Sequence, residues 1–160
     1  MQAIVRLYRW SHALYGTKWH LASRAIDSIS RMLFAASVPG RATIGRNVFF
    51  HHSGLGVVIN GASVIEDDCE IGVHVVLGGR APVVGAPHLG KGVIVHAGAK
   101  IIGPIHIGEG SVVAANATVI SDMPPNSLIT GTPATVKRTG ISIKDYRKDV
   151  DSQLMDGNAA

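Results

Sequence analysis

The sequence predicts an all-β solenoid preceded by a short helical segment, and three observations support this fold class. From Ile59 to Val119, a branched aliphatic residue recurs at every sixth position. The 160 residues include 19 glycines, and only 5% are aromatic, so the core must be built from aliphatic side chains between many short turns. A chain of this length forms one domain with an ordinary core and leaves little room for a second.

The first expected element is a helical segment over residues 1–38. Apolar residues are spaced as on helices over about 3–16 and 18–36, and Gly16 can stop a helix between them. Arginines interrupt the apolar start, so we expect no signal peptide, and no stretch is long and apolar enough for a membrane span. The helices either pack on the base of an oligomer or lie on a membrane surface.

The main expected element is a β-solenoid domain over residues 39–138. Six residues make one strand and one turn, three such units make one triangular coil, and the repeating aliphatic side chain points inward. The fourth residue after each repeat position is usually small or β-branched, and Cys69 falls there, so we expect it in the core rather than as a nucleophile. Residues 139–160 are expected to form a polar tail or short helix. The repeat positions are Ile59, Ile65, Ile71, Leu77, Val83, Leu89, Val95, Ile101, Ile107, Val113 and Val119.

Two irregularities in the repeat mark the expected functional loops. The step from Phe50 to Ile59 is nine residues instead of six, and the extra residues fall in the stretch HHSGLG, which begins at His51. Residues 78–90 keep the spacing but contain two prolines and several glycines that disfavour a regular wall, together with His88. An insertion in a solenoid must leave the wall as a loop, and such loops commonly carry binding residues.

Composition excludes several classes of function. The net charge is +4 and the pI near 9.5, but Lys and Arg are spread over both ends without stacking aromatics, so we expect no nucleic-acid partner. A single cysteine excludes an internal disulfide and a cysteine-based zinc site. His74, His96 and His106 lie in regular repeats without carboxylates at ligand spacing, so no metal is expected. Asp67 and Asp68 are expected to shape a coil corner.

The stretch from about Pro39 to Arg138 resembles the left-handed parallel β-helix acyltransferases, and within them the serine acetyltransferase group. The resemblance rests on HHSGLGVVINGASVIEDDCEIGVHVVLGG, VIVHAGAKIIGPIHIGEGSVVAANATVI and MPPNSLITGTPATVKR. The short helical N-terminus, the HH doublet, VVIN and PHLG are most similar to small exopolysaccharide acetyltransferases of the colanic-acid type. The resemblance implies a left-handed β-helix, a homotrimer with active sites between subunits, and transfer of acetyl from acetyl-CoA to a hydroxyl.

His51 and His52 begin the first irregular stretch, and the resemblance implies a different role for each. Counting six-residue steps from Ile44, His52 matches the family's catalytic histidine, whereas counting back from Gly78 puts Ser53 there. Because imidazole titrates near neutral pH and can accept a hydroxyl proton, His52 is the expected general base. His51 falls where serine acetyltransferases have an aspartate that helps to hold the amino acid, and we expect His51 and Ser53 to contact the acceptor.

Other landmarks of the family are missing at the matching positions. The stretch that carries the carboxylate partner of the catalytic histidine is matched here by Ser37 and Pro39. The second family histidine is matched by Ala86, and His88 lies two residues further on, in a shorter loop. We include His88 as a second catalytic candidate. The missing carboxylates argue against serine as the acceptor.

The resemblance also implies a groove between coils for acetyl-CoA, held largely by backbone groups, so that small residues line its path. Lys137 and Arg138 can pair with the phosphates of the cofactor. The matching small positions are Gly78, Gly79, Ala97, Gly98 and Ala115, with Gly131 and Pro133 in the terminal turn.

We therefore predict an enzyme, an acetyl-CoA-dependent O-acetyltransferase that moves acetyl to a hydroxyl of a glycan or exopolysaccharide precursor. Two alternatives stay open, namely a serine O-acetyltransferase of cysteine biosynthesis and a non-catalytic β-helix scaffold. The expected partners are other copies of the chain and a small-molecule or glycan acceptor. We expect a cytoplasmic protein, placed at the inner face of the membrane if the N-terminal helices bind lipid.

Overall fold

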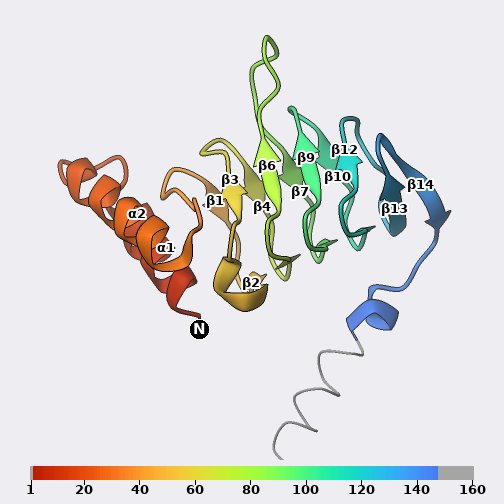
Figure 1. The fold of residues 1–160 in the computed structure, drawn as a ribbon, viewed down its shortest axis with the longest axis horizontal. Helices are drawn as coiled ribbons and strands as arrows, with labels where there is room; N and C mark the ends of the chain where they lie inside the picture. The colour runs from red at the N-terminus through yellow and green to blue at the C-terminus, as the bar shows by residue number, and fades with distance from the viewer. Residues whose placement is uncertain (1, 148–160) are drawn as a thin grey trace, which may run out of the picture.

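The computed structural model describes residues 2–147, and these form two helices followed by a β-solenoid (Figure 1). Helices α1 (Ala3–Leu14) and α2 (His20–Phe34) lie together at one end of the solenoid. Residues 148–160 of the expected tail lie outside the described residues. The strands are β1 (Thr43–Ile44), β2 (Phe49–Phe50), β3 (Val58–Ile59), β4 (Val64–Ile65), β5 (Glu70–Ile71), β6 (Val76–Gly78), β7 (His88–Leu89), β8 (Ile94–Val95), β9 (Lys100–Ile102), β10 (His106–Ile107), β11 (Val112–Val113), β12 (Thr118–Val119), β13 (Ser127–Gly131) and β14 (Ala134–Thr139).

Three sheets form the walls of the solenoid, and the chain visits them in turn. Their strand orders are β1-β4-β7-β10, β14-β13-β11-β8-β5-β2 and β12-β9-β6-β3. All pairings are parallel except that of β13 with β14, which is antiparallel. The predicted left-handed parallel β-helix is therefore confirmed, with about four turns.

The inward positions form one continuous aliphatic column, as the six-residue period predicts. Leu77, Leu89 and Ile101 are completely buried, and Cys69 lies beside the column with no exposed surface. Stacking brings each buried residue against its equivalents in the coils above and below, for example Ile71 against Val95. The apolar core therefore runs through the whole solenoid.

The six-residue count predicts that Val83 points into the core, and this prediction is wrong. Strands β6 and β7 belong to successive walls, so the twelve residues from Leu77 to Leu89 contain one ordinary step and six inserted residues. The insertion protrudes as a long loop between β6 and β7 (Figure 1), where Val83 is 46% exposed and Val84 is 94% exposed. The inserted length equals one repeat, which is why counting alone could not reveal it.

Helix α1 closes the N-terminal end of the solenoid. Its apolar residues Ile4, Val5 and Tyr8 join the buried core, while its polar side chains bond to backbone groups of the first coil. The bonds run from Tyr8 Oη to Ala42 O (2.8 Å), from Ile44 N to Tyr8 Oη (3.0 Å), from Gln2 Nε2 to Phe50 O (2.6 Å), from Phe50 N to Gln2 Oε1 (2.8 Å) and from an Arg9 guanidinium N–H to Gly45 O (2.6 Å).

The opposite end is closed by the reversal of β14 against β13, and the segment after β14 packs on the outside of the sheet. Residues 143–147 form a helical turn, in line with the expected short helix. Ile141, Ile143 and Tyr146 pack against Ile94 and Val112, which face outward from the six-stranded sheet. The C-terminal segment therefore returns across the outside of this sheet.

Candidate active site

The histidine doublet lies on a 3₁₀ turn, η1 (His51–Gly54), that leaves the wall directly after β2. His52 (φ 49°, ψ 43°) and Ser53 (φ 58°, ψ 23°) both have left-handed backbone conformations, which are unfavourable for residues other than glycine. The turn is held by the bond from Val57 N to Gly54 O (2.9 Å). The predicted break in the repeat is thus confirmed, and it presents His52 to solvent.

His52 lines an open cavity of about 280 Å³ on the outside of the six-stranded sheet. The other walls come from segments far apart in the sequence, because β2, β5 and β8 lie side by side in this sheet. Tyr146 closes one side from the C-terminal helical turn. The polar and small residues around the cavity are His51, His52, Glu70, His96, Ala97 and Tyr146.

Glu70 is the carboxylate of this cavity. His51 Nε2 lies 3.3 Å from Glu70 Oε2, and Arg147 Nε donates a hydrogen bond of 2.8 Å to Glu70 Oε1. Arg147 also donates to the carbonyl of Asp68, which fixes the C-terminal turn against the solenoid. A negative and a positive side chain therefore meet at the edge of the cavity. The sequence patterns did not point to Glu70, Tyr146 or Arg147, because the pairing that places Glu70 beside Phe49, one coil away, is visible only in the structure.

His96 lines the same cavity as the doublet, and the pKa of its ring is lowered. Partial burial of the ring is the largest cause that lowers the pKa of His96, and the nearby His51 lowers it further, while Glu70 acts in the opposite direction. Desolvation and a neighbouring cation both disfavour the imidazolium form. His96 therefore presents a neutral ring to the cavity at pH 7.

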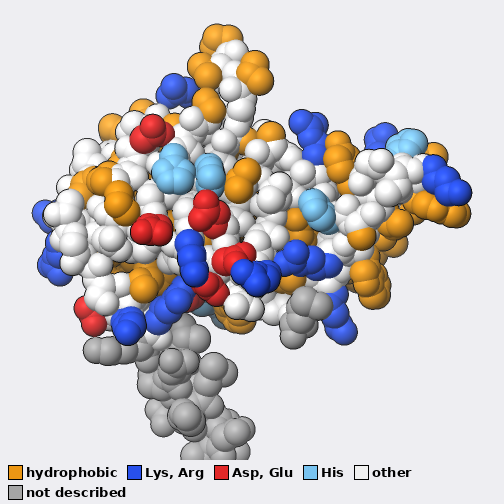
Figure 2. Space-filling model, turned by 180° about the vertical axis from the view of Figure 1, so that it is seen from behind, with side chains coloured by type: hydrophobic (Ala, Val, Ile, Leu, Met, Phe, Trp, Pro, Cys, Tyr) orange, Lys and Arg blue, Asp and Glu red, His pale blue; other side chains and the backbone are white. Residues whose placement is uncertain are grey.

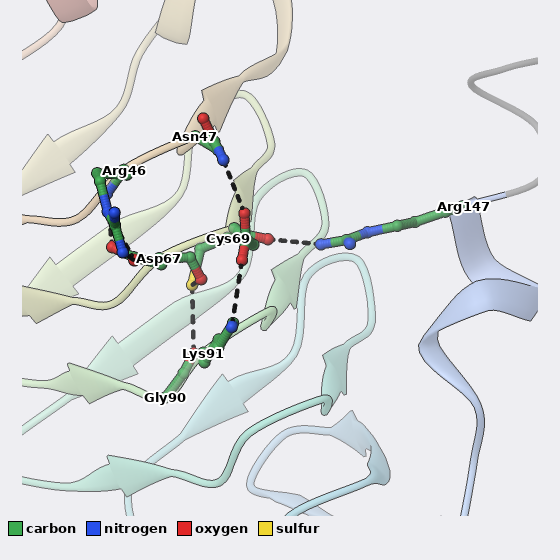
Figure 3. Close-up of polar contacts among 8 residues, drawn as sticks. Arg46, Asn47, Asp67, Cys69, Gly90, Lys91 and Arg147 are labelled. Carbon is green, nitrogen blue, oxygen red and sulfur yellow. Dashed lines mark hydrogen bonds and ion pairs between the residues drawn. The ribbon is translucent and has the colours of Figure 1, made fainter.

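The turn at residues 67–69 confirms two predictions about the coil corner and the cysteine (Figure 3). The backbone N–H of Arg46 donates to Asp67 Oδ1 (2.7 Å), and this bond, followed by the Arg46 guanidinium, lowers the pKa of Asp67. Asp68 adopts φ 63° and accepts a bond from Asn47 Nδ2 (3.1 Å). Cys69 Sγ points inward to Gly90 O (3.2 Å), and burial raises the pKa of its thiol to about 12.

His88 lies on a different wall from His52. It belongs to β7, where its Nε2 is 2.8 Å from Glu66 Oε1 and its ring meets His106 edge to face at 4.7 Å. Within one chain, His88 and the doublet therefore face separate surfaces. A joint site would need His88 from another copy of the chain, and the role of His88 stays a prediction.

Several small residues predicted to contact the cofactor share one edge of the solenoid. Ala97 and Ala115 lie two residues after β8 and β11, and Gly131 ends the longer strand β13. The register of β8, β11 and β13 stacks these three positions in successive coils. Pro133 follows Gly131 in the turn to β14, on which Lys137 and Arg138 are exposed. This small-residue edge begins at the cavity, because Ala97 lines it.

The remaining predicted positions lie elsewhere. Gly78 ends β6 on the neighbouring wall and Gly79 follows it, while Gly98 occupies a left-handed corner (φ +72°) directly after Ala97. Ser53 follows His52 in the 3₁₀ turn and is exposed. Between residues 2 and 147, no group of three His, Cys, Asp or Glu residues is arranged to hold a metal ion.

Comparison with known proteins shows what the repeat is similar to. Residues 86–121 match the family described as bacterial transferase hexapeptide (six repeats). Over 65 residues the chain is 40% identical to serine acetyltransferase from Bacillus subtilis, and over 61 residues it is 39% identical to that from Staphylococcus aureus. These matches span 41% and 38% of this chain, but only 27% and 28% of the relatives.

Solved structures extend the similarity to most of the fold. Soybean serine acetyltransferase is 36% identical with a TM-score of 0.79, over 83% of this chain and 55% of that chain. Serine acetyltransferase from Brucella abortus in complex with coenzyme A is 30% identical with a TM-score of 0.80, over 86% of this chain and 56% of that chain. The chain thus spans about half the length of these solved proteins. These relatives are serine acetyltransferases, so the finer similarity to exopolysaccharide enzymes stays a prediction.

Proposed function

We propose that this protein is an acetyl-CoA-dependent O-acetyltransferase of the serine acetyltransferase type. The observation that carries the proposal is the position of His52, exposed on a strained turn beside a cavity that contains Glu70 and opens onto the small-residue edge. Similar solved proteins include serine acetyltransferases in complex with CoA, which supports acetyl-CoA as the donor. We further propose a trimer in which a neighbouring subunit completes the site.

His52 acts as the general base in the proposed reaction. Its imidazole takes the proton of the acceptor hydroxyl while the oxygen attacks the thioester carbonyl, so that a C–O bond forms. The C–S bond then breaks, and the imidazolium returns the proton to the sulfur of coenzyme A. His51 bonds to Glu70 instead of projecting freely, so the structure supports a division of roles between the two rings.

L-Serine is the better supported acceptor, in place of the glycan that we expected first. The relatives found are serine acetyltransferases, and the cavity edge carries a carboxylate and a guanidinium side by side. Glu70 can bind the ammonium group of an amino acid and Arg147 its carboxylate, because ionised partners make the strongest hydrogen bonds. A neutral sugar would use neither charge.

A glycan hydroxyl is the second candidate, and one observation favours it. Ser37 and His51 stand where the resemblance places carboxylates, so the family's usual means of holding serine is absent at both positions. In this reading Glu70 positions His51 and contacts no acceptor. The acceptor would then be supplied at the inner face of a membrane, where we propose the protein is located.

The first experiment measures thiol release from acetyl-CoA with L-serine and with a panel of monosaccharides and short glycans. His52→Asn removes the base but keeps a residue that tolerates the left-handed backbone. We expect a loss of roughly 10²–10⁴-fold in kcat. The control His20→Asn changes an exposed histidine on α2 and leaves turnover unchanged. Equal activity of His52→Asn and wild type would refute His52 as the general base. No release above background with any acceptor would support the scaffold reading instead.

The variant Glu70→Gln distinguishes L-serine from a glycan as the acceptor. If serine is the acceptor, the loss of the negative charge raises KM for serine about tenfold or more, with a smaller change in KM for acetyl-CoA. Saturable turnover with a glycan but none with serine would exclude the serine proposal. Gln keeps the size of the side chain and one hydrogen bond to Arg147, which separates charge from packing.

A further inference from the structure

Helix α2 packs with its polar side against the rest of the protein, the reverse of what a surface helix usually does. Ser23 and Ser30 are almost completely buried, and Asp27 points toward α1. Ser11 Oγ of α1 lies 2.8 Å from Ser23 Oγ and donates to Asp27 Oδ1 at 2.5 Å. Asp27 also accepts a bond from the backbone of Gly40 at 3.2 Å. The contact between the two helices is therefore made largely by hydroxyl and carboxylate groups.

The aliphatic side of α2 faces solvent as a consequence. Met32 is 86% exposed, Leu33 and Leu21 are each 67% exposed, and Ile29 is 50% exposed. Residues spaced by three, four and eight positions share one side of a helix. We call this surface the outer face of α2, formed by Leu21, Ala25, Ile29, Met32 and Leu33. Clustered exposed apolar side chains of this size mark a binding surface.

Cations and tryptophans border the outer face. Arg24 and Arg31 lie seven residues apart and so share one flank of α2, and both are exposed. Trp19 is exposed at the start of α2, with the Lys18 ammonium 5.9 Å from its ring centre. Figure 2 shows hydrophobic and basic side chains together at the helical end of the molecule, without an acidic one on that side. Asp27, the one acidic residue in positions 2–34, points inward.

We propose that the outer face of α2 binds the surface of an anionic lipid bilayer. An aliphatic strip bordered by Arg, Lys and Trp is the pattern of helices that lie in the bilayer interface. No helix among the described residues is long and apolar enough to cross a bilayer, so the contact is peripheral. The positive charge around the outer face of α2 favours a lipid surface over a second copy of the chain. Two copies of this face would bring two cationic surfaces together, whereas anionic headgroups complement it.

The test is flotation of the full chain with vesicles of phosphatidylcholine, with and without phosphatidylglycerol. Wild type is expected to float with the anionic vesicles and to dissociate at high salt. Arg24→Gln with Arg31→Gln should lower the ratio of bound to free protein about 30-fold, since each cation near an anionic surface contributes about 1 kcal/mol. Met32→Glu with Leu33→Glu should abolish flotation.

The control is Val83→Glu with Val84→Glu, which places the same two charges at exposed valines of the loop between β6 and β7 and should float like wild type. Failure of wild type to bind anionic vesicles overturns the proposal, and so does unchanged binding of the Met32 and Leu33 variant. Light scattering without vesicles measures the oligomer mass and tests whether this face instead contacts another copy of the chain. If that variant lowers the oligomer mass, the outer face of α2 is a contact between copies of the chain and the lipid proposal is wrong.

Discussion

Replacing Gly56 by alanine would test how the turn with the histidine doublet is held in place. Gly56 lies two residues after η1, has φ +69°, and packs directly on the ring of His74. A Cβ atom at this position would come within 2.0 Å of His74 Nδ1 and 2.5 Å of its Cε1. Either the imidazole or the turn must move, and the bond from His74 N to Leu55 O (2.9 Å) ties the two together.

Two separate costs determine the expected destabilisation by Gly56→Ala. The left-handed backbone costs alanine about 1–2 kcal/mol relative to glycine. The overlap with the His74 ring adds about 1–3 kcal/mol, because this exposed ring must leave its rotamer or the turn must shift. The free energy of unfolding should therefore fall by about 2–5 kcal/mol. Gly92→Ala is the matched control, because Gly92 has φ +68° and no heavy atom near the added Cβ, so it reports the backbone cost alone.

Urea unfolding at one protein concentration, with turnover measured in parallel, is the assay. His74→Ala removes the ring, so Gly56→Ala made in that background should cost only the backbone share, about 1–2 kcal/mol. The difference between the two backgrounds is a coupling energy of about 1–3 kcal/mol. The reasoning is refuted if Gly56→Ala costs no more than Gly92→Ala, or if removing the His74 ring rescues nothing.

Three further predictions concern the core and the cavity. Cys69 should react with a thiol reagent at pH 8 more than about 100-fold slower in the folded protein than in urea, because burial raises its pKa to about 12; equal rates would contradict its placement. Ile101→Ala should cost about 2–5 kcal/mol in urea unfolding, against less than about 1 for the exposed Ile120→Ala, and similar costs would contradict a continuous core. His96 has a lowered pKa when folded, so its stabilisation is complete above its unfolded pKa of about 6.5 and is lost as the pH falls through that value toward the folded pKa. His96→Gln should therefore flatten the acid side of the stability profile, and an unchanged profile would argue against the shift.

The solenoid could be predicted from the sequence because its period reports directly on burial. Each coil repeats the same geometry, so Ile59 and Ile101 obey one rule although they lie more than forty residues apart. Val83 shows the limit of that rule, because an insertion equal to one repeat preserves the count while it leaves the wall. The nine-residue step before Ile59 was visible because three extra residues break the count.

The residues of the cavity could be predicted only in part, because some are marked by a sequence pattern and others are brought there only by the tertiary structure. His51 and His52 were identified from the broken repeat, and Ala97 from the resemblance. Glu70 occupies an outward position in a regular repeat, and it becomes informative only when β2 and β5 are known to pair. Tyr146 reaches the cavity through the return of the C-terminal segment over the outer side of the sheet, which no local pattern encodes.

The closure of both ends of the solenoid has a consequence for solubility. A parallel β-helix presents at each pole a coil whose backbone groups could pair with another chain, as unprotected edge strands do in fibrils. Gln2, Tyr8 and Arg9 occupy backbone groups of the first coil, and β14 reverses direction against β13 at the last wall. Helix α1 and the reversal of β14 therefore protect the two poles from pairing with another chain. Removal of α1 should lead to end-to-end polymerisation of the protein.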